Sequence, residues 1–345
     1  LRPRLAGPNR CMRRPGPDLP MRHFLRQLAI NPTAVVWTPV AAVVAPIVLV
    51  AVRAAAGNWI PTGDDAYFTV RSRDVFTTNH PLLGAWSSGS VDLVNPINNL
   101  GPMQLDLLAP FTRWSPMGGT AIGVAIINVA AIVATAWLVS RVAGRTAVLP
   151  AMVAVGLLVW TMGSEMLITP RQHQFLLLPY LCLLVAAWAV TAGDRWAIIV
   201  AVIAGSLVAQ THLSYPILVA ALAVTMMVGQ LATKRESTSN RRPLLLSAAI
   251  GAVLWSQTLF EQVFRSGNLG DVLFGSGDAG RTGLRDGWRI VAGVLVTPFT
   301  LLRPGFGRFD DGAMLASSVQ SIALAVALIA AIVWVARSII TGNWR

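Results

Sequence analysis

Residues 34–56 read AVVWTPVAAVVAPIVLVAVRAAA, and Arg53 is the only charged residue among them. An α-helix needs roughly 20 consecutive apolar residues to cross the hydrocarbon core of a bilayer, and it satisfies its own backbone polar groups there. A cleavable signal peptide is the alternative, because Ala54-Ala55-Ala56 resembles a cleavage site. The apolar region of a signal peptide spans only ~7–15 residues, however. We therefore predict a membrane-spanning anchor.

Similar apolar blocks follow along the chain, at residues 121–142, 147–162, 175–192, 196–210, 216–231, 243–260 and 315–335. Of the 345 residues, 54% are hydrophobic and only 12% are charged. A soluble domain of this size needs more charge to cover its surface. A transmembrane barrel would show alternating segments of about ten residues, and the sequence contains none. We predict an all-α polytopic transmembrane helical bundle with about eight crossings.

Basic residues indicate the orientation of this bundle. The turns predicted to share one side with the N-terminus carry Arg141, Arg145, Arg195, Lys234, Arg235, Arg241 and Arg242. Cytoplasmic loops are enriched in Lys and Arg, so we predict the plasma membrane as the location and a cytoplasmic N-terminus. The final turn, with Arg337 and Arg345, is cytoplasmic only if residues 288–302 do not cross. That shorter segment carries Pro298, and we prefer a surface helix for it.

The formal net charge of +12 does not indicate nucleic-acid binding. Arginines crowd the first 26 residues, and a basic tail before an apolar span is typical of a topology signal near anionic lipid. No zinc-knuckle or RNP-like motif accompanies the tail. We divide the chain into a basic cytoplasmic tail, 1–33, and a transmembrane domain, 34–345, that contacts membrane lipids. We also expect the natural start at Met21 and a truncated C-terminus.

The acidic residues indicate where polar chemistry takes place. Only Asp18, Asp194 and Glu236 fall on the predicted inner side, and the other acids fall outside. The outer loop at 57–119 contains Gly63-Asp64-Asp65, which indicates a helix entry. Asp64 can cap free amides there, and both acids favour the positive helix end.

Two amphipathic segments are predicted within this outer loop. The first places Tyr67, Val70 and Phe76 on one side and Arg71, Arg73 and Asp74 on the other. The second begins at Pro102, where the first helical position tolerates proline, and continues with Met103, Leu105, Leu107, Leu108 and Phe111. Both patterns are typical of helices that lie in the membrane interface.

Several short motifs resemble those of GT-C-type glycosyltransferases. They are Gly63-Asp64-Asp65-Ala66, Arg73-Asp74-Val75-Phe76, His80-Pro81-Leu82-Leu83-Gly84, Gly101-Pro102 with Asp106-Leu107-Leu108-Ala109-Pro110, Ala209-Gln210-Thr211-His212-Leu213-Ser214-Tyr215 and Val253-Leu254-Trp255. The chain is similar to the actinobacterial multi-pass members, which are relatives of protein mannosyltransferases and cell-wall arabinosyltransferases. This resemblance implies transfer of a sugar from a polyprenyl-phosphate donor to a cell-envelope glycan or protein acceptor on the outer face.

The resemblance also implies roles for individual residues. A carboxylate must take the proton of the acceptor hydroxyl, and Asp64 or Asp65 would be this base. Asp64 is favoured because it occupies the family's Gly-Asp position, and Asp65 is kept beside it. Positive charge from Arg or a divalent metal must stabilise the leaving phosphate. The candidate substrate-binding residues are Arg53, Arg71, Arg73, Asp74, His80, Glu165, Arg171, His173 and His212. The histidines lack the spacing of known metal motifs, so the metal remains unknown.

Structural roles compete with these functional ones. The acidic pair can be a helix cap, Arg53 a snorkelling anchor, and Arg71 and Arg73 contacts to lipid head groups. The histidines can be hydrogen-bonding residues of the outer turns. Two other functions also stay open: a transporter or flippase of a lipid-linked precursor, and a non-catalytic membrane protein with a GT-C-like fold.

Overall fold

The computed structural model describes residues 32–87, 97–115, 117–232, 241–274, 283–296 and 316–341. The chain folds into two compact units, residues 1–275 and 276–345. Most of the predicted basic tail and Pro298 lie outside the described residues. The described residues are helical apart from turns, loops and an isolated antiparallel bridge between Trp86 and Asn98.

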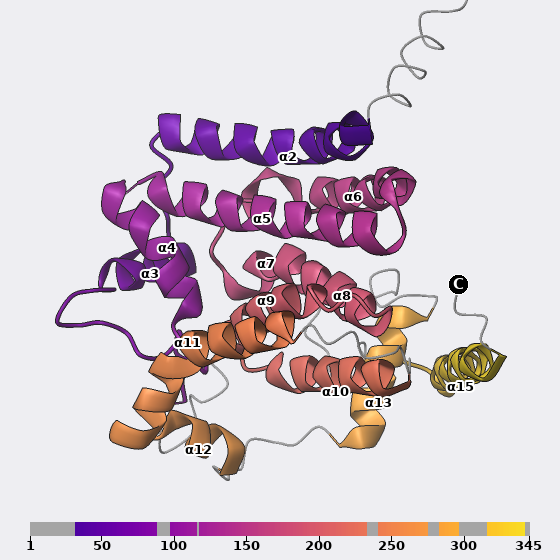
Figure 1. Ribbon diagram of the computed structural model, residues 1–345. Coiled ribbons are helices and arrows are strands. Elements are labelled where there is room, and N and C mark those ends of the chain that lie inside the picture. The colour runs from indigo at the N-terminus through magenta and orange to yellow at the C-terminus, as the bar shows by residue number, and fades with distance from the viewer. Residues whose placement is uncertain are drawn as a thin grey trace, which may run out of the picture. The chain divides into compact units, whose positions relative to one another are not determined.

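The first unit contains α2 (Pro32–Ala56), α3 (Asp64–Arg73), α4 (Met103–Trp114), α5 (Gly119–Val142), η2 (Arg145–Ala147), α6 (Val148–Met166), α7 (Gln172–Phe175), α8 (Leu177–Thr191), α9 (Ala197–Thr211), α10 (Pro216–Ala232), α11 (Arg242–Phe264) and α12 (Asn268–Phe274). The second contains α13 (Leu284–Leu295) and α15 (Ser318–Thr341). Figure 1 shows α2, α5 and α6 packed side by side, with α3 and α4 near one end of α5.

Five helices are long and apolar enough to cross a membrane: Thr33–Ala56, Gly119–Val142, Arg145–Met166, Gln172–Thr191 and Arg242–Phe264. Three shorter apolar helices occupy Ala197–Thr211, Pro216–Leu231 and Ser318–Ala331. The prediction of an all-α architecture is confirmed for the described residues. The five long helices also correspond to five of the predicted blocks. The predicted 147–162 block continues to Met166, although Gly163 departs from helical geometry with φ 69° and ψ 175°.

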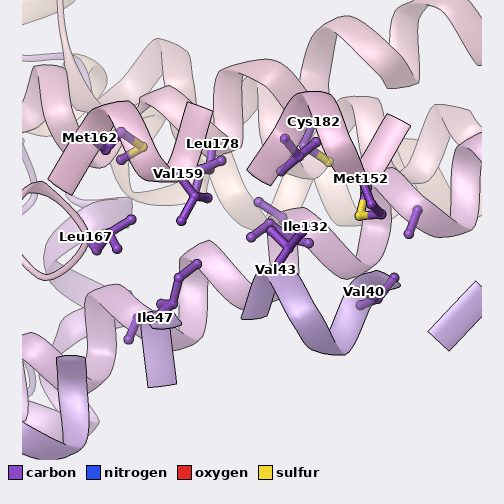
Figure 2. Close-up of a cluster of buried hydrophobic side chains, with 14 of the residues drawn as sticks. Val40, Val43, Ile47, Ile132, Met152, Val159, Met162, Leu167, Leu178 and Cys182 are labelled. Carbon is purple, nitrogen blue, oxygen red and sulfur yellow. The ribbon is translucent and has the colours of Figure 1, made fainter. Parts of the chain in front are cut away.

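The core between α2, α5, α6 and α8 is built from apolar side chains (Figure 2). Val40, Val43 and Ile47 recur at helical spacing and form the buried stripe of α2. They meet Ile132 of α5 and Met152 of α6. In a bilayer the surrounding lipid is as apolar as these side chains, so close packing rather than water exclusion holds such helices together.

A second core joins α8 and α9 through small residues. Ala186 and Ala189 of α8 and Ala201 and Ala204 of α9 are all buried in one cluster. Small side chains let the two backbones approach closely, which is the usual basis of helix association in membranes. This part of the unit holds the loop between α9 and α10, where His212 lies.

Helix α3 is tied to the bundle through a polar face. Its buried residues are Asp65, Phe68, Thr69 and Ser72, which recur at helical spacing. The Thr69 and Thr120 hydroxyl oxygens lie 2.7 Å apart, and the Ser72 hydroxyl donates to Thr112 Oγ1 of α4 at 2.9 Å. Tyr67, Val70 and Phe76 are exposed together, and so is Arg73 of the predicted polar side. The buried face carries Phe68 beside its polar residues instead.

The ends of the two loop helices differ slightly from the prediction. Gly63 is the N-cap of α3, with φ 56°, and no side chain caps this helix end. Asp64 is instead the first helical residue, so its charge acts on the positive helix end without a capping hydrogen bond. Pro102 stands one position earlier than expected, as the N-cap of α4, which is within the usual variation of helix boundaries.

Helices α11 and α12 are joined by a buried carboxylate. Glu261 is 2% exposed and accepts hydrogen bonds from the hydroxyl and backbone N–H of Ser266 and from the backbone N–H of Asn268. Asn268 also exchanges two hydrogen bonds with the backbone of Asn98, at 2.8 and 3.0 Å. These bonds fix the backbone of Asn98, before α4, against α12.

In the second unit α13 packs against α15. The Trp288 indole donates to the Ser321 carbonyl at 3.1 Å, and Arg289 Nε donates to the Ala316 carbonyl at 3.0 Å. Ile290 and Val294 are exposed on α13. The helix ends at Leu295, so the residues from 297 onward of the predicted short segment lie outside the described residues.

Candidate functional site

The best-defined polar cluster surrounds Asp65. This side chain is 5% exposed, and its Oδ1 accepts a hydrogen bond from the Thr169 hydroxyl at 2.5 Å. The Arg171 Nε lies 3.3 Å from the same oxygen. Both partners come from the segment between α6 and α8, more than a hundred positions along the chain. A buried carboxylate needs such partners, because an unpaired buried charge is strongly unfavourable.

Arg171 connects this buried acid to the surface of the protein. Its side chain is 42% exposed, although its Nε is buried and makes only the ion-pair contact with Asp65. The guanidinium group can therefore neutralise Asp65 and still meet a charged ligand. Asp64 is exposed, so the two adjacent acids lie in different environments.

The other predicted residues on α3 and its C-terminal turn do not join this cluster. Arg71 pairs with Asp74 at 2.6 Å, as neighbours on the helix surface do. Arg73 is exposed. Arg53 and Glu165 line a separate cavity between α2 and α6. The structure therefore distributes the predicted cations over several places.

A second polar cluster, held by hydrogen bonds, links three segments that are distant in the sequence. The His80 Nδ1 accepts the backbone N–H of Phe76 at 3.0 Å, so the proton of the neutral imidazole lies on Nε2. This Nε2 is 3.0 Å from Gln257 Oε1, and Gln257 Nε2 donates to Asp106 Oδ2 at 2.8 Å. The second Asp106 oxygen, Oδ1, is buried without a hydrogen-bond partner. Asp106 and Gln257 were not among the predicted site residues.

Burial raises the pKa of the Asp106 carboxyl, and the hydrogen bond from Gln257 and the electrostatic effect of the His80 imidazole oppose this effect. A raised folded-state pKa means that the folded protein binds the proton more tightly than the unfolded chain. The contribution of Asp106 to the free energy of unfolding is therefore complete below the ordinary carboxyl pKa of 3.8. It is lost as pH rises through the raised pKa.

Asp106→Asn tests this pH dependence. Asparagine keeps an oxygen for the Gln257 amide and cannot ionise, so we expect thermal stability to fall less as pH rises from 3.8. The measurement is the unfolding temperature of purified wild type and variant across this pH range. An Asp271→Asn variant serves as the control, because Asp271 lies on α12 and takes no part in the contacts between Asp106, Gln257 and His80. Parallel curves for wild type and Asp106→Asn would contradict the assignment.

A third cluster contains two of the predicted histidines. The rings of His173 and His212 lie 4.4 Å apart, and Tyr215 stands edge-on to His212 at 6.0 Å. Burial, together with the charge of His173, lowers the pKa of His212. Tyr180 packs against Tyr215 at 5.3 Å. The third predicted histidine, His80, belongs to the Asp106 cluster instead.

The beginning of α4 holds the three clusters near one another. Gln104 donates to the Pro170 carbonyl at 2.5 Å, and the Gly101 N–H donates to the Gln210 carbonyl at 3.3 Å. Gln172 donates to the Thr211 carbonyl at 2.5 Å. The segments that carry Asp65, Asp106 and the histidines are thereby connected by short polar contacts.

Buried oxygens without hydrogen-bond partners lie beside Gly101. They are Gln210 Oε1 and Thr258 Oγ1, and a Cβ atom on Gly101 would lie 2.2 and 2.6 Å from them. The glycine therefore makes room for both side chains. Only the resemblance of residues 209–215 pointed to Gln210, and no sequence signal marked Thr258.

Among the described residues, no group of three or more His, Cys, Asp or Glu side chains could hold a metal ion. Asp65 already contacts a guanidinium group, and Asp106 is bonded to an amide. Arg171 is the cation that the structure places beside Asp65.

Comparison with known proteins gives no match to a family model, a curated protein or a solved structure. The class is therefore defined by the fold itself: a helical chain with five helices long and apolar enough to cross a membrane.

Proposed function

We propose that this chain is an integral membrane glycosyltransferase. It transfers a sugar from a polyprenyl-phosphate donor to a cell-envelope glycan or protein on the outer face of the membrane. The observation that supports this most is the buried Asp65 carboxylate beside the partly exposed guanidinium of Arg171, 3.3 Å away. The reaction needs a carboxylate to accept the hydroxyl proton and a cation to stabilise the leaving phosphate.

In the proposed reaction the acceptor hydroxyl oxygen attacks the anomeric carbon of the donor sugar. A new carbon–oxygen bond forms, and the bond between the anomeric carbon and the phosphate oxygen breaks. The hydroxyl proton passes to Asp65, acting as a general base. The bonding electrons leave with polyprenyl phosphate, whose charge Arg171 stabilises. Asp64 is the exposed alternative for the base.

Asp106 suits a role in holding the acceptor. Its Oδ1 is buried without a partner, so it can accept a hydrogen bond from a sugar hydroxyl. Gln257 and His80 fix the carboxylate from behind. Such second contacts orient the reacting groups, which is a large part of catalysis when two substrates meet.

We propose about eight crossings, formed by the five long apolar helices and the three shorter ones, with α13 at the membrane surface. At 1.5 Å per residue α9 and α10 are about 22 and 25 Å long, which requires a thinned bilayer or extension by flanking residues. The N-terminus is cytoplasmic, so α3 and α4 lie outside.

Single cysteines test this topology. With Cys11 and Cys182 replaced by serine and alanine, Asn79→Cys should react with a membrane-impermeant maleimide on intact cells. Arg145→Cys should react only after the membrane is opened. Both side chains are exposed, so access depends on the side of the membrane. The reverse labelling pattern would place Asp65 in the cytosol and remove the proposed function.

Transfer itself is tested with radiolabelled polyprenyl-phosphoryl mannose and arabinose. Membranes that contain the protein should label glycan or protein and release polyprenyl phosphate. Movement of intact donor across the membrane would instead indicate a flippase. The absence of both labelled product and donor movement would indicate a non-catalytic protein.

A further inference from the structure

Two cavities follow one another along the seam between α2 and α6. The first, of about 280 Å³, is lined by Pro39, Ala42, Val43, Pro46, Leu149, Met152, Val153, Gly156 and Val159. The second, of about 500 Å³, is lined by Val50, Arg53, Ala54, Gly57, Trp59, Ser164, Glu165 and Ile168. The lining of the first is entirely apolar, whereas the second carries one cation and one anion. Both are distinct from the Asp65 cluster.

Arg53 and Glu165 are both available to a ligand. Each side chain belongs to an exposed residue, and within the described part of the chain neither forms an ion pair with another residue. Trp59 is partly buried in the same wall and packs against the core. An indole at this position is typical of the interface between hydrocarbon and head groups.

The spacing of the two cavities matches one leaflet of a bilayer. Their centres along α2 lie near residues 43 and 54, about 16 Å apart at 1.5 Å per residue. Half of the hydrocarbon core is about 15 Å thick. A molecule whose head occupies the charged second cavity would thus place its apolar tail in the first cavity, near the bilayer centre.

We propose that this seam binds a zwitterionic phospholipid with an ammonium group, such as phosphatidylethanolamine. Arg53 binds the phosphate, because guanidinium and phosphate form charge-assisted hydrogen bonds. Glu165 binds the ammonium, and the apolar cavity holds an acyl chain beside Val43 and Gly156. An anionic lipid of similar size would bring its phosphate to Arg53 but leave Glu165 without a cation. The proposal rests on the proposed membrane insertion, not on sugar transfer.

The test measures lipid retained by the purified full chain. Protein is reconstituted in nanodiscs of equal phosphatidylethanolamine and phosphatidylglycerol, extracted mildly and analysed by native mass spectrometry. We expect wild type to retain phosphatidylethanolamine over phosphatidylglycerol by about fivefold, the effect of one charge contact near a membrane surface. Glu165→Gln should remove this preference or favour phosphatidylglycerol. Arg53→Gln should reduce retention of both lipids.

The apolar half of the site has its own variant. A Cβ on Gly156 would lie 3.4 Å from Val43 Cγ2, so Gly156→Leu should extend into the cavity and lower retention of both lipids about fivefold, as loss of about one buried chain contact predicts. Leu157→Phe is the control, because Leu157 is 54% exposed and lines neither cavity. Its lipid retention should equal that of wild type.

A double variant keeps the test valid if single changes disturb folding. Arg53→Glu with Glu165→Arg preserves one charge of each sign and should keep the lipid preference. Equal lipid ratios in wild type and Glu165→Gln would overturn the proposal, as would unchanged retention in Gly156→Leu. Recovery in the membrane fraction is recorded for every variant, so failure of lipid binding is distinguished from failure of membrane insertion.

Discussion

Replacing Asp65 with asparagine is expected to lower sugar transfer by about 100-fold or more, which is the usual contribution of a general base. Asparagine has nearly the same shape and can still accept the hydrogen bond from Thr169, but it cannot take the acceptor's proton. The assay is incorporation of radiolabelled sugar from the polyprenyl-phosphate donor by membranes with matched amounts of protein. Polyprenyl phosphate released in the same reactions gives a second readout.

Two further variants separate chemistry from structure. Asp64→Asn should lower transfer little, because Asp64 is exposed and its neighbour holds the contacts to Thr169 and Arg171. Thr169→Val removes the hydrogen bond but leaves the carboxylate, so it should retain more activity than Asp65→Asn. Full transfer by Asp65→Asn, with a near-complete loss in Asp64→Asn, would assign the base to Asp64. Full activity in both variants would exclude the acidic pair.

Gly119→Ala is expected to destabilise the protein by about 3 kcal/mol or more, at the upper end of the effect of overpacking. A Cβ on Gly119 would lie 2.0 Å from the carbonyl oxygen of Phe111 and 2.6 Å from its carbonyl carbon. Both atoms belong to the backbone, so no side-chain rotation relieves the clash. The contact between the start of α5 and the end of α4 must open instead. The measurement is the unfolding temperature of the purified protein in detergent.

Gly205→Ala is the matched control. Gly205 lies inside α9, and its Cβ would meet Val219 and Leu183 at 3.4 and 3.6 Å, which is ordinary contact. Alanine is also the better helix former. An unfolding temperature that fell equally in both variants would show that the contact between α4 and α5 has no special tightness.

The helices that could cross a membrane were predictable because each one is an apolar block bounded by polar residues. Residues 34–56 correspond closely to α2. The boundaries were less predictable where local backbone chemistry acts. Gly163 adopts a positive φ inside α6, and the block predicted to begin at 175 is preceded by the short helix α7. An apolar pattern contains no signal for either feature.

The candidate site was predictable only in part. The acidic pair was noticed because two acids follow an apolar span, but the sequence favoured Asp64, whereas the structure gives the buried contacts to Asp65. The ring contact between His173 and His212 joins two of the three histidines among the predicted site residues. The partners Thr169 and Gln257 could not be predicted, because neutral hydrogen-bonding residues occur throughout such chains. The series of hydrogen bonds from His80 through Gln257 to Asp106 joins residues up to 177 positions apart, and only tertiary packing creates it.

The polar contacts that hold α3 against α4 and α5 have a consequence for access to the proposed site. The hydroxyl groups of Thr69 and Ser72 are hydrogen-bonded to α5 and α4. An outward movement of α3 would therefore leave buried hydroxyl groups of α4 and α5 without these partners. A hinged cover formed by α3 is therefore energetically disfavoured. Selection among ligands at the proposed site would then depend on the shape of the surface around Asp65 and Arg171 rather than on movement of α3.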